Sequence, residues 1–318
     1  MAGNYLHNHR NFPDLLRILG EEKGIEPYLI EKDYWIMHVL YGLQQQQFTF
    51  ELKGGTSLSK AFKIIHRFSE DIDIQIHAPA EFKINENPKN TNANNVKARK
   101  AFYDWLAVNI KIDGIVRIER DETFDDKDYY RSGGIRLYYK SFTTQVKGIK
   151  EGILLEAGFD STSPNQQVTI SSWAYDKAIA TQGIEIPDNR ATHVVCYYPE
   201  YTFVEKLQTI ATKYRKEQEG EEDRPNFMRQ YYDVYCLLGE ERIQEFIATP
   251  QYQEHKQKRF PAADREIPIA ENQAYLLDNA EIRKSYKKRY EDTAGLYYQG
   301  QPAFEELLER IKQYLNRL

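Results

Sequence analysis

The amino-acid sequence predicts an α+β fold: a mixed sheet with flanking helices, followed by a mostly helical C-terminal half. Two observations lead to this prediction. Short β-branched and apolar stretches alternate with helical patterns up to about residue 198, and helical spacing dominates afterwards. Hydrophobic residues make up 41% and charged residues 29% of the 318 positions, as in a packed globular protein. We therefore expect a first domain at 1–198 and a helical domain at 199–318.

The individual elements follow from periodicity. Apolar residues at helical spacing predict helices, and β-branched or aromatic runs predict strands. In the first half the expected helices are 12–20, 26–46, 56–66 and 94–111, and the expected strands are 48–53, 71–77, 115–121, 134–140, 149–159 and a short one ending near Tyr198. Residues 160–166 read as a loop. In the second half the expected helices are 200–217, 226–238, 240–248, 270–290 and 302–317.

A diglycine turn, Gly54-Gly55, follows the strand expected at 48–53. Glycine has no Cβ, so it allows a sharp turn and a close approach of the backbone to a ligand. Thr56 and Ser57 come next, at the expected N-terminus of a helix, where unpaired N–H groups favour a phosphate. A diglycine alone is most often only a turn, but here two carboxylates follow on the next strand.

Asp71 and Asp73 lie two residues apart in an otherwise apolar strand, so both side chains point to the same face. Two hard oxygen ligands together with substrate phosphates are a usual arrangement for Mg²⁺ or Mn²⁺. Glu156 is the candidate third acid, because it stands among apolar neighbours on a strand that can lie beside the aspartate strand. The alternative for Glu156 is a solvent-facing position on an antiparallel strand.

These segments resemble the AbiEii-type nucleotidyltransferase toxins of the DNA polymerase β-like superfamily. The resemblance lies in Lys-Gly-Gly-Thr-Ser-Leu-Ser-Lys at 53–60 and Arg-Phe-Ser-Glu-Asp-Ile-Asp-Ile at 67–74. Further matches are Glu-Lys-Asp-Tyr-Trp at 31–35, Glu-Lys-Leu at 205–207 and the segment 229–235. The resemblance implies a nucleotidyltransferase-like sheet, a nucleoside triphosphate as substrate and a separately encoded antitoxin. It also supports Glu156 as a site residue.

Lys206 lies in a mostly apolar helical segment and can place its ammonium on a phosphate. The resemblance implies that Lys206 is a catalytic residue. It also implies an acidic side chain at Asp233, which could position Lys206 or a group of the nucleotide. From spacing alone, Asp233 is four residues after Arg229, so a surface ion pair on one helix face is the alternative. Lys213 is a candidate for binding the triphosphate or an RNA backbone, or else is simply solvated. Gln230 departs from the His that many family members have there, which puts proton transfer at that position in doubt.

Composition restricts the class of protein. The net charge is −5 and the sequence pI about 5.9, so nucleic-acid binding would need a local basic face, for which 206–216 and 283–289 are candidates. The two cysteines, Cys196 and Cys236, lack metal-ligand spacing and indicate free thiols in a reducing compartment. We expect no membrane span, no leader sequence and a cytoplasmic protein.

The sequence therefore predicts a metal-dependent nucleotidyltransferase. It would transfer a nucleotide from a nucleoside triphosphate to an RNA 3′ end, such as that of a tRNA, or to a protein hydroxyl. Two alternatives stay open. One is a nucleotide-binding interaction protein with a degenerate site, and the other is a phosphotransferase that modifies a partner protein with the same residues.

Overall fold

The computed structural model describes residues 4–181, 183, 185–222 and 226–318. The chain forms two compact units. Unit 1 contains Met1–Ala61 and Phe68–Tyr197, and unit 2 contains Phe62–Arg67 and Tyr198–Leu318. The short segment Phe62–Arg67 is thus part of unit 2 although unit 1 surrounds it in sequence. The proposed domains 1–198 and 199–318 remain a prediction.

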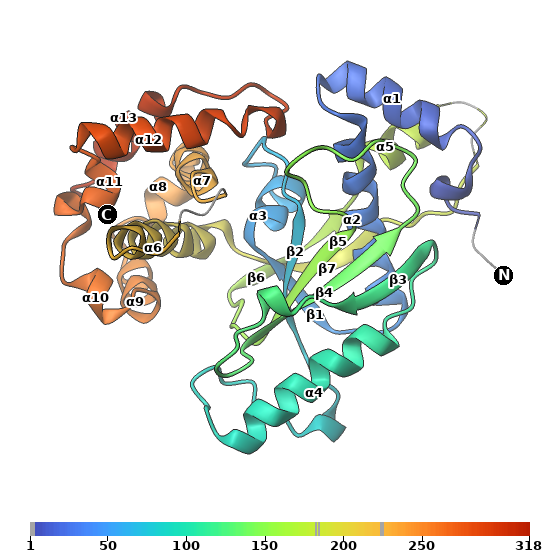
Figure 1. Cartoon of the computed structure of the whole chain (residues 1–318), viewed down its shortest axis with the longest axis horizontal. Helices are drawn as coiled ribbons and strands as arrows, with labels where there is room; N and C mark the ends of the chain where they lie inside the picture. The colour runs from blue at the N-terminus through green and yellow to red at the C-terminus, as the bar shows by residue number, and fades with distance from the viewer. Residues whose placement is uncertain (1–3, 182, 184, 223–225) are drawn as a thin grey trace. The chain divides into compact units, whose positions relative to one another are not determined.

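Unit 1 is built on one mixed sheet (Figure 1). In the described part of the chain its seven strands follow the order β3-β4-β5-β2-β1-β7-β6. Their bounds are β1 Phe50–Lys53, β2 Asp71–Ile76, β3 Ile115–Arg120, β4 Ser132–Tyr139, β5 Ile153–Gly158, β6 Asn165–Ile170 and β7 Ala191–Tyr197. β2 pairs antiparallel with β1 and parallel with β5, and β4 pairs antiparallel with β5. The α+β prediction with a mixed sheet is confirmed.

The helices of unit 1 surround this sheet. They are η1 Leu6–Asn8, α1 Phe12–Lys23, α2 Pro27–Gln45, α3 Gly54–Thr56, the π-helical turn η2 Ser57–Ala61, η3 Ala80–Phe82, α4 Ala93–Asn109, η4 Glu122–Phe124 and α5 Trp173–Ile179. The helix expected at 56–66 is wrong beyond Ala61, because Phe62–Arg67 leaves the helix and Lys63 adopts a positive φ of 56°. The loop expected at 160–166 is wrong at its end, where β6 begins at Asn165.

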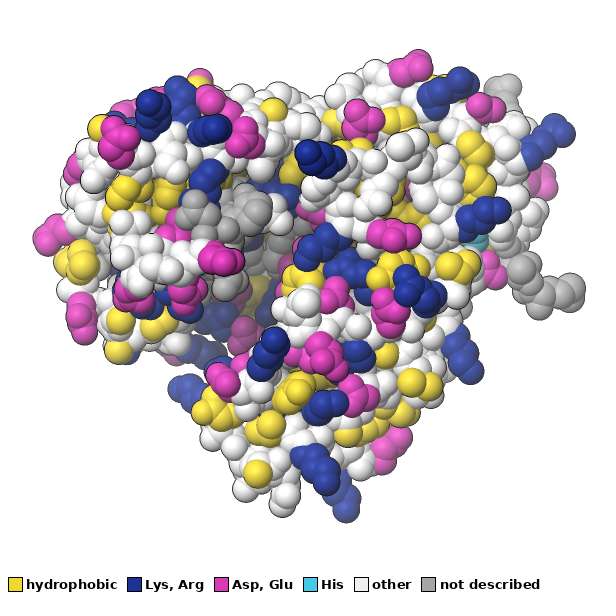
Figure 2. All heavy atoms as spheres, viewed as in Figure 1, with side chains coloured by type: hydrophobic (Ala, Val, Ile, Leu, Met, Phe, Trp, Pro, Cys, Tyr) yellow, Lys and Arg dark blue, Asp and Glu magenta, His cyan; other side chains and the backbone are white. Residues whose placement is uncertain are grey.

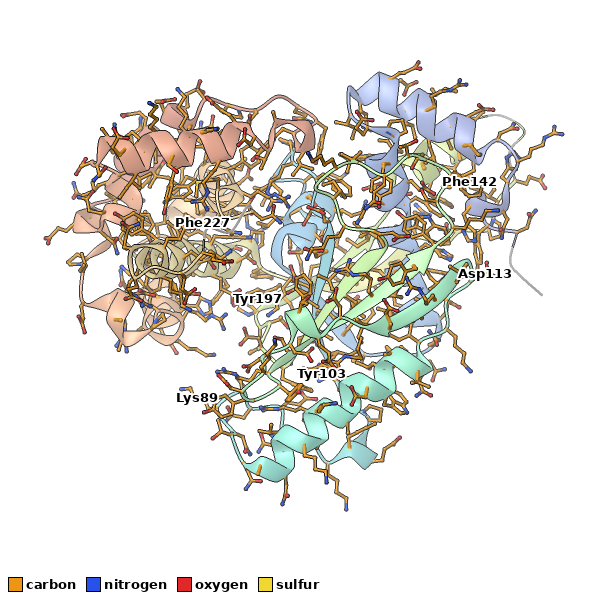
Figure 3. The ribbon with its side chains drawn as sticks, viewed as in Figure 1. Lys89, Tyr103, Asp113, Phe142, Tyr197 and Phe227 are labelled. Atoms are coloured by element: carbon orange, nitrogen blue, oxygen red, sulfur yellow. The ribbon has the colours of Figure 1, made fainter. Side chains whose placement is uncertain are left out.

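One face of the sheet is apolar and covered by helices. On β2, Ile72, Ile74 and Ile76 are fully buried, while the residues between them are half-buried on the opposite face. Tyr103 of α4 lies against Gly133 of β4 so closely that a Cβ there would be 2.6 Å from its ring (Figure 3). Trp35 of α2 stacks on Tyr139, six residues further along β4 and therefore on the same face. α2 and α4 thus cover the apolar face and leave the polar face for Asp71 and Asp73.

Unit 2 is helical in its described residues. Its elements are α6 Pro199–Gln218, α7 Arg229–Leu237, α8 Glu241–Phe246, α9 Pro250–Arg259, α10 Ala262–Arg265, η5 Ile269–Glu271, α11 Gln273–Leu276, α12 Ala280–Glu291, η6 Ala294–Leu296 and α13 Phe304–Tyr314. The helical C-terminal half is confirmed. The single helix expected at 270–290 is wrong. α11 ends at Leu276, because Leu277 adopts a positive φ of 47°, and α12 begins at Ala280. α9 and α10 were not predicted.

Candidate active site

The diglycine turn lies directly against Asp73. Gly54 has a φ of +73°, and a Cβ on it would be 2.2 Å from Oδ2 of Asp73. Any other residue at position 54 would therefore be strained in its backbone and would collide with the carboxylate. Lys53, the residue before the turn, is in register with Asp73 across the β1–β2 pair. The sequence requirement for glycine is thus explained by the neighbouring acid.

Thr56 and Ser57 are fully buried, and both hydroxyls are used within the protein. The Thr56 hydroxyl donates to the carbonyl of Asp71, which ties the turn to the first residue of β2. The Ser57 hydroxyl donates to the carbonyl of Gly54 at 3.1 Å. A phosphate at this turn would therefore meet backbone N–H groups, since the first N–H groups of a helical turn have no acceptor within the helix.

Three carboxylates share the polar face of the sheet. Asp73 is opposite Glu156 in the parallel β2–β5 pair, so the prediction that the Glu156 strand lies beside the aspartate strand is confirmed. Asp71 is opposite Leu154, two residues before Glu156. Paired residues on neighbouring strands and residues two apart on one strand point to the same face. All three acids are half-buried, so the solvent-facing alternative for Glu156 does not hold.

The electrostatics of these acids indicate a site that is short of positive charge. Burial raises the pKa of Asp71 to about 6, with further contributions from the charges of Asp73 and Glu70. Burial also raises the pKa of Glu156 to about 8, reinforced by Asp73 and Asp71. Lys150 opposes both shifts and Lys53 opposes that of Glu156. Acids held close together with raised pKa values are typical of functional sites.

The residues present fit a divalent cation in their chemistry but do not complete a site by themselves. Within the described residues, no group of three or more His, Cys, Asp or Glu side chains is arranged so that it could hold a metal ion. Mg²⁺ usually takes only one or two carboxylates and completes its shell with water and substrate phosphates. Asp71 and Asp73 beside a phosphate-binding turn match that pattern.

Three consecutive charged residues of α2 hold the surroundings of this site. Glu31, Lys32 and Asp33 are all buried, at 0%, 1% and 3% exposure. Glu31 accepts hydrogen bonds from the hydroxyls of Ser141 and Thr143 at 2.7 and 2.6 Å. Lys32 donates to the carbonyl of Lys150 at 2.6 Å. The motif thus fixes the segment that leads into β5.

Asp33 connects α2 to the turn itself. It accepts a hydrogen bond from the ammonium of Lys60, three residues after Ser57, and one from the backbone N–H of Trp173 at 2.8 Å. The side chains of Asp33 and Lys60 are 5% and 9% exposed. This ion pair positions the helical turn after the diglycine. The segment 31–35 was part of the family resemblance, but no role was predicted for its residues.

Unit 2 contains a second charged cluster, centred on Asp233. The guanidinium of Arg67 donates to both carboxylate oxygens of Asp233 at 2.7 and 2.6 Å, and the ammonium of Lys206 is 3.0 Å from Oδ2. Asp233 is fully buried, so the alternative that it forms an ion pair with Arg229 on the helix surface is wrong. Burial alone would raise the pKa of Asp233, but Arg67 and Lys206 outweigh burial and lower it. Asp233 therefore fixes the side chain of Lys206.

Arg67 completes this cluster, and no sequence pattern predicted a role for it. Arg67 is only 4% exposed, and a buried arginine needs a carboxylate partner. Its position at the start of the segment 67–74, two residues after the apolar Ile64 and Ile65, is the available signal. The partner itself is 166 residues away and is not visible in any local pattern.

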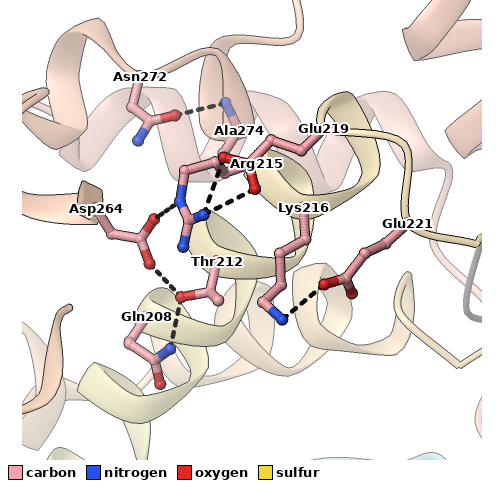
Figure 4. Close-up of polar contacts among 9 residues, drawn as sticks. All are labelled: Gln208, Thr212, Arg215, Lys216, Glu219, Glu221, Asp264, Asn272 and Ala274. Carbon is pink, nitrogen blue, oxygen red and sulfur yellow. Dashed lines mark hydrogen bonds and ion pairs between the residues drawn. The ribbon is translucent and has the colours of Figure 1, made fainter.

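Lys213 lies in a polar pocket of unit 2 with a volume of about 250 Å³, lined by α6 and the residues after it. Its ammonium is 5.8 Å from the ring of Phe227, which is labelled in Figure 3. The neighbouring cations of α6 are paired with acids: Arg215 with Glu219 and Asp264, and Lys216 with Glu221 (Figure 4). The cations beside Lys213 thus have acidic partners within unit 2.

The stretch 283–289 is similar. Arg289 forms a bidentate contact with Glu217 at 2.9 and 3.0 Å, and Lys287 contacts Glu305 at 2.9 Å. On the face shown in Figure 2, basic and acidic side chains are intermixed rather than gathered by sign. Acidic side chains therefore accompany both basic stretches of unit 2, and RNA binding by these stretches stays a prediction.

Two remaining expectations concern thiols and membranes. Cys196 and Cys236 are free thiols. None of the helices among the described residues has the length and apolar character needed to cross a membrane.

Comparison with known proteins identifies the family. The family model described as "Nucleotidyl transferase AbiEii toxin, Type IV TA system" matches residues 38–310. A search of curated proteins found no match. Among solved structures, the chain is similar to an antigenic nucleotidyltransferase-like protein from Paracoccidioides brasiliensis, at 12% identity and a TM-score of 0.33, over 73% of this chain and 95% of that one. Because the family model spans most of its length, the chain belongs to the AbiEii nucleotidyl transferase toxin family.

Proposed function

We propose that this protein is a metal-dependent nucleotidyltransferase that acts as the toxin of a toxin–antitoxin pair. Asp71, Asp73 and Glu156, together on the polar sheet face beside the diglycine turn, are the observation that supports this proposal most. The substrates would be a nucleoside triphosphate and a hydroxyl acceptor, either an RNA 3′ end, such as that of a tRNA, or a protein side chain. A separately encoded antitoxin and a cytoplasmic location belong to the same proposal.

The residues would divide the work as follows. Backbone N–H groups of the turn at Gly54, Gly55, Thr56 and Ser57 would bind and orient the phosphates. Asp71 and Asp73 would hold Mg²⁺ or Mn²⁺ together with substrate phosphates and water. Glu156 is proposed as a third ligand, although the three acids are not arranged as a ready-made metal group, so its side chain would have to move to reach the cation. When bound, the cation supplies charge stabilisation at the phosphate oxygens and activation of the attacking oxygen. Lys53 and Lys150, which already offset the charge of Glu156, would limit the repulsion between the acids.

Lys206 and Asp233 enter the proposal through the family resemblance. The contact between them at 3.0 Å supports a role for Asp233 in holding the Lys206 ammonium. An ammonium directed at a phosphate stabilises the charge that develops in the transition state. Lys213 would be a secondary contact to the triphosphate, and the paired charges around it make it the least supported of these residues.

Labelled nucleotides test the reaction. The protein would be incubated with each of the four nucleoside triphosphates, labelled at the α- or the γ-phosphate, together with Mg²⁺ and either total RNA or total protein. Transfer of the α-label to an acceptor is the expected result. Transfer of the γ-label would instead identify a phosphotransferase. Absence of both labels from RNA, protein and the enzyme itself would contradict the proposal and favour a binding protein with a degenerate site.

A further inference from the structure

A second polar pocket, with a volume of about 360 Å³, lies in unit 1 and is connected to the carboxylates by Lys53, which is opposite Asp73. Its lining is Lys53, Pro88, Asp126, Arg131, Ser132, Gly158 and Asp160, so each of its two cations has an acidic partner in the same lining. We infer that this pocket binds a backbone phosphate at the end of a single-stranded nucleic acid acceptor, through Lys53 and Arg131. The inference rests on the proposed function, because it names the acceptor of that reaction.

The strand register places this pocket on the far side of the carboxylates from the diglycine turn. β1 runs toward the turn, and β2 runs away from it through Asp71, Asp73 and Gln75. Gln75 is opposite Gly158, which in turn is opposite Ser132. The order along the polar face is therefore turn, carboxylates, pocket. With the triphosphate at the turn, the attacking hydroxyl must arrive from the opposite side in an in-line displacement.

Lys53 connects the carboxylates to the pocket. Its backbone is in register with Asp73, its charge acts on Glu156, and its ammonium reaches Asp160 at 3.5 Å. The Lys53 and Asp160 side chains are 21% and 34% exposed, and ion pairs with this much solvent contribute little stability. An incoming phosphate oxygen can therefore share the ammonium at low cost.

Arg131 supplies a second cation and an aromatic neighbour. Its Nε donates to Asp126, and its guanidinium lies 5.1 Å from the ring of Tyr129. Tyr129 is 38% exposed, which is unusual for a large aromatic side chain and suits stacking on an unpaired base. Lys89, next to the lining residue Pro88, is exposed and is labelled in Figure 3.

The combination favours nucleic acid over a protein acceptor. A planar guanidinium can donate two hydrogen bonds to one phosphate. Proteins that bind single-stranded nucleic acids commonly combine such cations with exposed aromatic rings on which bases stack. A protein side chain presenting a hydroxyl would need neither group.

Binding can be measured without catalysis. Fluorescence anisotropy with a labelled 12-nucleotide single-stranded RNA bearing a free 3′ hydroxyl, in the absence of triphosphate, would compare Lys53→Gln and Arg131→Gln with the wild type. Each substitution should weaken binding about three- to tenfold at low salt and lower the salt slope by about 0.7, as for one phosphate contact. The matched controls are Lys177→Gln and Arg190→Gln, whose side chains are similarly ion-paired in unit 1.

Separate measurements decide the remaining alternatives. Triphosphate affinity should be unchanged in Arg131→Gln, and Arg131→Lys should partly restore RNA binding if a cation is what matters. RNA affinity unchanged in both pocket variants would overturn the inference. So would a loss of triphosphate affinity in place of RNA affinity, or a loss of protein labelling in Arg131→Gln.

Two results distinguish a wrong assignment of the pocket from a wrong assignment of the reaction. If no nucleotide is transferred yet the pocket variants still lose RNA affinity, the proposed function is wrong and the phosphate-binding pocket stands. If Asp73→Asn abolishes transfer to RNA while both pocket variants transfer normally at low RNA concentration, the function stands and the pocket is wrongly assigned.

Discussion

Asp73 on β2 lies directly opposite Glu156 on the parallel strand β5, and the diglycine turn closes over the same carboxylate. Two acids and a backbone turn that are distant in sequence thereby meet at one point of the sheet. Since like charges this close repel without a counter-ion, the arrangement destabilises the empty protein slightly and favours cation binding.

Asp71→Asn and Asp73→Asn should each abolish nucleotide transfer while the fold is kept. Neither side chain is part of the apolar face, and removing one charge relieves the repulsion among the acids. The melting temperature should therefore stay constant or rise. Transfer rates and thermal unfolding would be measured together, with Asp14→Asn in the exposed part of α1 as the control. Near-normal transfer by either variant would rule out the metal-ligand assignment.

Binding of Mg²⁺ with triphosphate should strengthen as the pH rises from 6 to 8. The pKa of Asp71 is raised to about 6 and that of Glu156 to about 8, so protons must leave before these acids bind a cation. Each proton released changes the affinity by at most about tenfold per pH unit. Titration calorimetry at several pH values would show the trend, and Glu156→Gln should make it shallower. Affinity independent of pH would argue against these ligands.

Lys206→Ala and Asp233→Asn should separate catalysis from stability. Loss of Lys206 leaves the Arg67–Asp233 contact in place, so the rate should fall about 10²–10³-fold with little loss of stability. Asp233→Asn leaves the buried Arg67 charge without its partner and should cost about 3–5 kcal/mol of unfolding free energy. Rates and denaturant titrations check this. If Lys206→Ala changes only the affinity for RNA, the wrong lysine has been assigned.

Asp33→Asn should weaken triphosphate binding from a distance. The substitution leaves the largely buried ammonium of Lys60 without its counter-charge and should cost about 3–5 kcal/mol. Because Lys60 follows the diglycine turn, the Michaelis constant for the triphosphate should rise more than the turnover number falls. Lys60→Met added to Asp33→Asn should recover much of the stability but not the binding. Full recovery of both would mean that the pair is structural only.

His38 should contribute a loss of stability as the pH falls from 6.5 toward 4, opposite in sign to the contributions of Asp71 and Glu156, whose raised pKa values favour the folded state on acidification. Burial, with the charge of His7, lowers the pKa of His38 from 6.5 to about 4, so His38 stays neutral in the folded state while the unfolded chain protonates. The contribution of this group is near zero above pH 6.5 and becomes a loss on the order of 3 kcal/mol as the pH approaches 4. Denaturant unfolding at several pH values would reveal it, and His38→Gln should flatten this part of the profile.

The sequence predicted the elements whose apolar pattern is regular. β2 alternates buried and half-buried residues without interruption, and the candidate acids could be read from it. β6 was missed because its outer position in the sheet leaves Asn165, Gln166 and Gln167 exposed, so no alternation marks it. The helix expected to reach residue 66 failed for a different reason. Ile65 is seven residues after Leu58, as on one face of a helix, yet Ile64 and Ile65 are buried in unit 2.

The ion pairs between residues distant in sequence could not be predicted from sequence patterns. Arg67 and Asp233 are 166 residues apart, and Lys60 and Asp33 are 27 apart on different elements. Spacing rules describe neighbours on one helix or strand, and they suggested Arg229 as the partner of Asp233. Tertiary packing determined the actual partner.

The placement of Phe62–Arg67 has a consequence for how such a gene can change. The chain leaves unit 1 after Ala61, returns at Phe68 and leaves again after Tyr197, so no single breakpoint separates the two units. In a fragment ending at Tyr197, the normally buried Ile65 and Arg67 would be exposed to solvent. The complementary fragment would lack Arg67, the partner of Asp233. Recombination at this boundary should therefore rarely yield a working protein, and the two halves should be inherited together.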